Sequence, residues 1–152
     1  MDSKVEFEKA RKNIINVKES KTLPLATYFT GGASLKVDIN GVEHSFETKD
    51  VTTAWLGGAD HVEMQGSERE QVLLMFHSKL EDGFHQFKDV QDALIGYIDR
   101  SGNIQPYVWH GSAYVAVSDD GKTKYGAIDV TFIQGVGEDR ICVRGGFFCH
   151  LN

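Results

Sequence analysis

Apolar and polar residues alternate along most of the chain after its N-terminal segment, and short turn sequences separate the alternating runs. Two such runs flank Asn40-Gly41, the dipeptide that best tolerates the positive φ angles of a type I′ turn. We therefore predict a hairpin in which Ile39 lies opposite Val42. The same register sets Leu35 against Phe46, so the apolar residues of both strands share one sheet face.

Further alternating runs bring the total to about nine or ten strands with short connections. One run, Glu70 to His77, is apolar on both faces, as expected for a central strand that is covered on both sides. The least regular stretch, residues 80–92, is compatible with a short strand followed by a helical turn. The pattern predicts an all-β fold, either an antiparallel β-sandwich or a barrel.

The last predicted strand contains both cysteines of the chain, Cys142 and Cys149. If the strand runs unbroken through Gly145-Gly146, their odd spacing places the two side chains on opposite faces. If Gly145-Gly146 is instead a two-residue turn, the two cysteines face each other and can form a disulfide. We favour the continuous strand and two free thiols.

The N-terminal segment has a different pattern from the rest of the chain. Ser3 and Glu6 are spaced as a helix-capping box, and apolar residues then recur every three or four positions, at Phe7, Ile14 and Val17. We expect an amphipathic helix within residues 1–20 that packs on the β domain. The alternative is that its apolar stripe contacts a partner or forms a homodimer.

Length and composition indicate one domain over residues 1–152, with 41% hydrophobic and 25% charged residues. Sixteen basic and 22 acidic residues give a net charge of −6, which disfavours nucleic acid and anionic membranes as partners. No apolar run is long enough for a membrane span, and the N-terminal residues show no apolar stretch typical of a signal peptide. We therefore expect a cytoplasmic protein; the alternative is a secreted form that has already been trimmed.

Six histidines are the first candidates for metal binding or acid–base chemistry, but none lies in a metal-binding motif. His44 stands out because the alternation places it on the apolar face, where it must find a hydrogen-bond partner or touch a ligand. A core histidine bonded to a neighbour gives the same pattern. We assign no catalytic residue, metal or cofactor.

Aromatic residues near strand ends are the other candidates for ligand contact, because they combine an apolar body with a polar tip. They also suit an ordinary core. The leading hypothesis is a non-enzymatic module that holds a small or partly apolar ligand in a pocket of at least roughly 300 Å³. The candidate ligand-binding residues are His44, Trp55, His77, Tyr107 and Trp109.

Two other functions remain open. A small acidic protein could act on a protein partner, as an interaction, inhibitor or immunity-type protein. Alternatively, His44 or His77 could serve as the general base of a hydrolase-like enzyme.

Overall fold

The computed structural model describes residues 29–56, 58–88, 92–104, 109–132 and 140–152, and every regular element within them is a strand. The predicted N-terminal helix lies outside these residues. The ten strands are β1 (Phe29–Ile39), β2 (Val42–Thr48), β3 (Asp50–Leu56), β4 (Ala59–Gln65), β5 (Gln71–Phe76), β6 (Gly83–Phe87), β7 (Ala93–Ile98), β8 (Trp109–Val117), β9 (Thr123–Phe132) and β10 (Ile141–Leu151).

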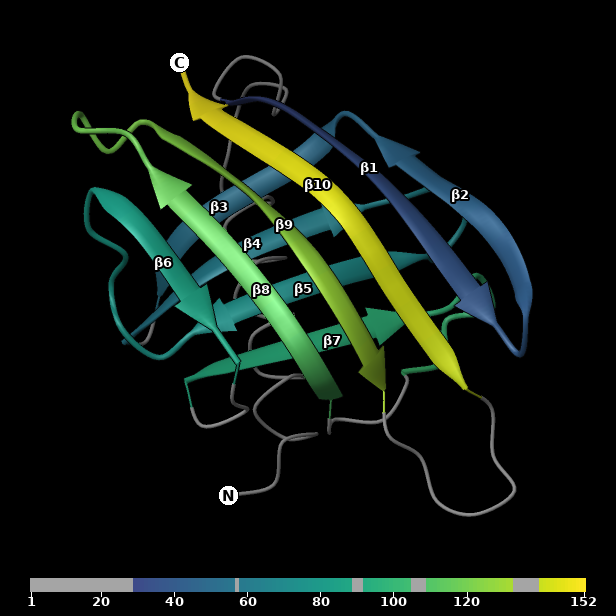
Figure 1. The fold of residues 1–152 in the computed structure, drawn as a ribbon. Coiled ribbons are helices and arrows are strands. Elements are labelled where there is room, and N and C mark those ends of the chain that lie inside the picture. Colours follow the sequence, from purple (N-terminus) through teal and green to yellow (C-terminus); the bar gives the residue numbers. More distant parts are fainter. Residues whose placement is uncertain (1–28, 57, 89–91, 105–108, 133–139) are drawn as a thin grey trace.

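The strands form two antiparallel sheets, one lying behind the other (Figure 1). The larger sheet has the order β2-β1-β10-β9-β8-β6, and the smaller has the order β3-β4-β5-β7. Buried apolar side chains from both sheets form one core, including Leu35 and Val143 from the larger sheet and Val62 and Ile95 from the smaller. The predicted all-β antiparallel fold of nine or ten strands is confirmed.

The first hairpin has the predicted register. Ile39 pairs with Val42, and Leu35 pairs with Phe46. Both turn residues, Asn40 and Gly41, have positive φ angles of 56° and 86°, as a type I′ turn requires. Leu35 and Phe46 are each 1% exposed, so the shared face that the pattern predicts lies in the core.

The run predicted as a central strand is β5, which lies between β4 and β7. All its residues are buried. Val72 and Leu74 join the core between the sheets, whereas Leu73 and Met75 join a second apolar cluster. In the stretch from 80 to 92, the predicted short strand is present as β6.

Strand β10 runs unbroken through Gly145 and Gly146 and pairs with β1 on one side and β9 on the other. A side chain at Gly145 would meet the backbone, because an added Cβ would lie 2.2 Å from the Ser34 carbonyl oxygen. Both cysteines are free, with Cys149 buried and Cys142 half-buried. The prediction of a continuous strand without a disulfide is confirmed.

A buried ion pair joins the two sheets. The Lys124 ammonium of β9 donates to Asp60 Oδ1 of β4 and to Thr53 Oγ1 of β3, each over 2.7 Å. The other Asp60 oxygen, Oδ2, accepts the backbone N–H of Leu80 at 3.1 Å. This cluster therefore also fixes the segment that leads into β6.

We predict that a thiol titration counts two cysteines in denaturant and that Cys149 reacts slowly in the folded protein. Burial raises the pKa of the Cys149 thiol to about 11, which suppresses the reactive thiolate. A Cys142→Ser variant isolates the signal of Cys149. A count of zero from a monomer would contradict the free thiols, and fast reaction of Cys149 in the folded variant would contradict its burial.

We also predict that Lys124→Met lowers the free energy of unfolding by about 3 kcal/mol, because the Asp60 carboxylate stays buried without its cation. Chemical denaturation measures this loss. Lys122→Met makes the same change at an exposed position two residues earlier, and we expect an effect within about 0.5 kcal/mol. Equal losses in the two variants would show that the ion pair does not join the sheets.

Candidate functional site

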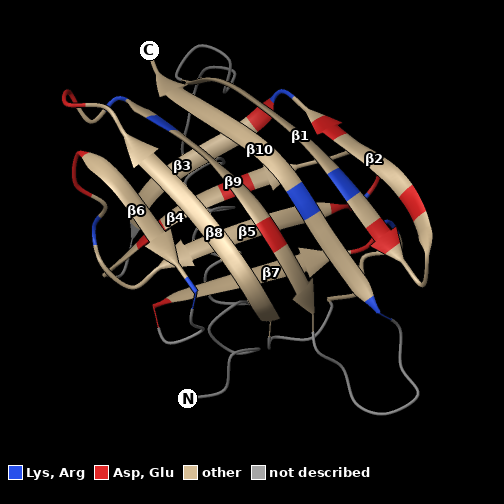
Figure 2. Ribbon diagram, in the orientation of Figure 1, with Lys and Arg blue, Asp and Glu red and all other residues tan. Residues whose placement is uncertain are grey.

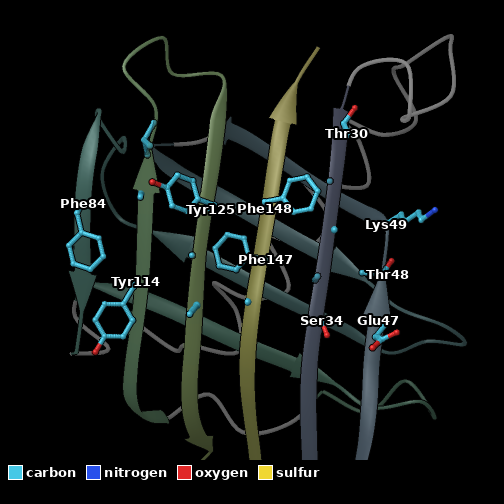
Figure 3. A pocket seen from close by; sticks show the side chains of 18 of the residues that line it. Thr30, Ser34, Glu47, Thr48, Lys49, Phe84, Tyr114, Tyr125, Phe147 and Phe148 are labelled. Carbon is cyan, nitrogen blue, oxygen red and sulfur yellow. The ribbon is translucent and has the colours of Figure 1, made fainter.

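An open groove of about 1550 Å³ crosses the outer face of the six-stranded sheet, the face turned away from the smaller sheet (Figure 3). Every strand of the six contributes to it. The lining residues are 30–34 of β1, Glu47 and Thr48 of β2, the following Lys49, Gly83 and Phe84 of β6, Tyr114, Ala116 and Val117 of β8, 125–127 of β9 and 146–148 of β10.

Strand pairing places three aromatic residues of the groove in one row across the sheet. Phe84 pairs with Ala116, and Ala116 pairs with Tyr125. Tyr125 pairs with Phe148, which in turn pairs with Gly32. Residues paired across antiparallel strands lie on the same face. The rings of Phe84, Tyr125 and Phe148 therefore project outward together, and the small residues between and beside them keep the floor low.

These three rings are open to solvent. Phe84 is 67% exposed, Tyr125 is 54% exposed and Phe148 is 45% exposed. Among the described residues, the other exposed large apolar side chains are Val42, Trp55 and Leu151. Half of this exposed apolar set is thus gathered in one groove, the kind of concentration that marks an interaction site.

Contacts with neighbouring residues hold the rings of Phe84 and Tyr114 at the β6 end of the groove. Phe84 stacks on Tyr114, with the ring centroids 5.7 Å apart and the planes 25° apart. The Tyr114 hydroxyl oxygen lies 3.2 Å from both Gln86 Nε2 and Ser112 Oγ, and each of these groups donates to it. Because Phe84 and Tyr114 are held in advance, this end of the groove loses less conformational entropy when it binds a ligand.

The next row across the sheet ends in polar residues. It runs from Tyr114 through Ala127 and Gly146 to Ser34 and Glu47. Ser34 and Glu47 are both exposed, so their oxygen atoms are available at the β1–β2 side of the groove. The groove is therefore aromatic toward β6 and polar toward β2, as the labelled side chains in Figure 3 show.

The groove carries little charge. Glu47 and Lys49 are the charged residues among those that line it, and their charges cancel. Strand β8 contains no Asp, Glu, Lys or Arg, and Arg144 is the one such residue in β10, as Figure 2 shows. The lining therefore offers no cluster of cations for an anionic ligand.

His44, the histidine predicted to face inward, points away from the groove and contacts a buried carboxylate. Its Nε2 atom lies 2.5 Å from Glu70 Oε2, and Glu70 is 1% exposed. The Tyr97 hydroxyl donates to the same oxygen, and Arg100 Nε lies 3.7 Å from Oε1. Burial, together with the hydrogen bond to Glu70, raises the pKa of Tyr97, so its phenol remains a donor. The cluster links edge strand β2 to the smaller sheet.

The other predicted ligand-binding residues are dispersed. Trp109 is 3% exposed within the core, and its Nε1–H has no hydrogen-bond partner in the part of the chain that the structure describes. Trp55 is 47% exposed near the end of β3, and His77 is exposed after β5. Tyr107 lies outside the described residues. None of His44, Trp55, His77 and Trp109 lines the groove, and their contact with a ligand stays a prediction.

The candidates from the sequence do not include Phe84, Tyr125 or Phe148, although the sequence contains one signal for them. The alternation of the last strand already places Phe148 on the face opposite Ile141 and Phe147. An aromatic residue that faces away from the core indicates a binding surface when other exposed rings lie beside it. The same test applied to Tyr125 and Ile128 of β9 would have found a second ring.

Among the described residues, no group of three or more histidine, cysteine, aspartate or glutamate side chains could hold a metal ion. This part of the chain also contains no helical segment with the length and apolar character of a membrane span. In comparisons with models of known families, with curated proteins and with solved structures, nothing matches the chain. The geometry of the groove is therefore the basis for assigning a function.

Proposed function

We propose that the chain is a ligand-binding module and that the groove on its six-stranded sheet takes a small or partly apolar ligand. The observation that carries the proposal is the row of Phe84, Tyr125 and Phe148, three exposed rings set along one line across the sheet above small residues. Concave sites that combine apolar side chains with a few polar groups are typical of small-molecule binding.

An estimate of the binding energy indicates what the ligand must offer. Covering about 200 Å² of aromatic surface contributes about 5 kcal/mol at about 25 cal/mol per Å². Association itself costs at least about 4 kcal/mol in lost freedom of motion. Stacking alone therefore gives weak binding, and the ligand must also form hydrogen bonds with polar residues such as Ser34 and Glu47.

The lining favours binding over catalysis. The described residues that line the groove include no histidine, no cysteine and no pair of carboxylates. General acid–base catalysis depends on such groups within hydrogen-bond reach of the substrate. Glu47 is the one carboxylate of the lining, and we assign it a role in hydrogen bonding to the ligand.

We also propose that the two sheets form a β-sandwich and that the chain lies in the cytoplasm. Two stacked sheets with a shared core suit a β-sandwich better than a closed barrel. Free thiols suit a reducing compartment such as the cytoplasm.

A protein partner is the second candidate function. The same exposed rings could pack against another protein, and a net charge of −6 would favour a basic one. Light scattering of the purified protein and pull-down from native lysate separate this function from small-ligand binding. A stable complex that covers the groove would favour it.

We predict that a neutral, polarity-sensitive naphthylamine dye binds the groove and that its fluorescence rises on binding. The double substitution Tyr125→Thr and Phe148→Thr should lower the dye affinity at least about tenfold, because the dye loses two stacking surfaces. Threonine keeps the strand preference of these positions. A fluorescence titration measures the affinity.

The control is Val42→Thr, which changes an apolar residue that is 73% exposed and lies outside the groove. We expect this variant to bind the dye as the unmodified protein does. Thermal unfolding checks that all variants fold. Unchanged affinity in the folded double variant would contradict the proposed site.

A further inference from the structure

The groove is longer than a ligand with a single small ring. It receives residues from all six strands of the sheet, from β6 at one edge to β2 at the other. Neighbouring strands lie about 4.8 Å apart, so the groove extends over about 24 Å across the strands. A ligand that reaches from one edge of the sheet to the other is an elongated molecule that lies across the strands.

The rings are spaced along this direction instead of forming one stack. Phe84 and Tyr125 stand two strands apart, about 10 Å, with Ala116 between them, and Phe148 follows on the next strand. Separated rings can each support a different part of the ligand. The ligand should therefore present several flat apolar faces in succession.

Polar groups lie beside the rings along the same path. Tyr114 and Tyr125 contribute phenolic hydroxyl groups, Ser34 contributes an alcohol, and Glu47 contributes a carboxylate at the far end. These groups donate and accept hydrogen bonds, as a ligand with many hydroxyl groups requires. A plain hydrocarbon chain would cover Tyr125, Ser34 and Glu47 without offering them hydrogen bonds, and would incur the cost of removing these groups from water.

Charge restricts the ligand further. Glu47 and Lys49 cancel, so the groove is complementary to an uncharged ligand, while the chain as a whole carries a net charge of −6. A polyanion such as a nucleic acid could stack its bases on the rings, but Lys49 is the one cation among the lining residues, and the exposed Lys36 and Arg144 beside the groove are engaged by Ser45 and Glu43.

We propose that the ligand is a neutral oligosaccharide that lies across the strands, with its sugar rings stacked on Phe84, Tyr125 and Phe148. A sugar ring has a flat face of C–H groups and an edge of hydroxyl groups, which matches the succession of rings and polar side chains. This inference rests on the proposed ligand-binding function of the same groove. It adds the chemical class of the ligand and its direction across the sheet.

The test uses linear neutral oligosaccharides of glucose, mannose, galactose and N-acetylglucosamine, each from the disaccharide to the hexasaccharide. Binding is measured by calorimetry and by displacement of the neutral naphthylamine dye. We expect at least one series to bind, with an affinity that rises with chain length until the groove is filled. An acidic oligosaccharide of the same length should bind more weakly.

Two substitutions test the direction of the ligand. Phe84 lies at one edge of the sheet, so Phe84→Thr should weaken the hexasaccharide about tenfold and leave the disaccharide within about twofold. Phe148 lies near the middle, so Phe148→Thr should weaken both. Val42→Thr changes an exposed apolar residue outside the groove and should change neither.

The outcomes separate the inference from the function on which it rests. If the dye binds in the groove but no neutral oligosaccharide binds or displaces it, the oligosaccharide is ruled out and the binding module stands. If the dye does not bind either, both proposals fail. Tighter binding of acidic than of neutral oligosaccharides, or equal effects of Phe84→Thr on all lengths, would also overturn the inference.

Discussion

The two-sided pairing of β10 is the constraint on which the larger sheet depends. This strand pairs with β1 along its whole length and with β9 along nearly all of it. It therefore joins the β1–β2 hairpin to strands β9, β8 and β6. Because strand residues alternate between faces, Val143 and Phe147 enter the core while Gly146 and Phe148 form part of the groove. A shift of one residue in this pairing would exchange the two sets. One register therefore determines both the stability of the fold and the shape of its outer face.

Local features of the chain predict local structure well. Asn40-Gly41 predicts the first turn and its register, and the apolar run around Leu73 predicts a strand buried on both faces. The order of the strands could not be predicted in this way, because alternation describes one strand at a time. That β10 lies beside β1, and that the short β6 is an edge strand, are consequences of long-range packing.

Because alternation describes one strand at a time, the site could be predicted only in part. His44 was correctly placed on the inner face, but its partner Glu70 stands 26 residues away and follows from the contact between the sheets. Trp109 was a candidate because it combines an apolar body with a polar tip, but its ring lies in the core. The groove needs Phe84, Tyr125 and Phe148 in one row, which depends on three separate strand pairings. Each ring alone is unremarkable in the sequence, and Phe84 lies in its least regular stretch.

The most direct test of the outer sheet face as the ligand surface is amide chemical-shift mapping by NMR during titration with the neutral naphthylamine dye. The largest shifts should cluster in β8, β9, β10 and β1, around Ala116, Tyr125, Phe148 and Gly32. Residues near His44 and Trp109 should change little, since neither lines the groove. Shifts that cluster around these two residues, or on the four-stranded sheet, would contradict the assignment of the groove as the binding site.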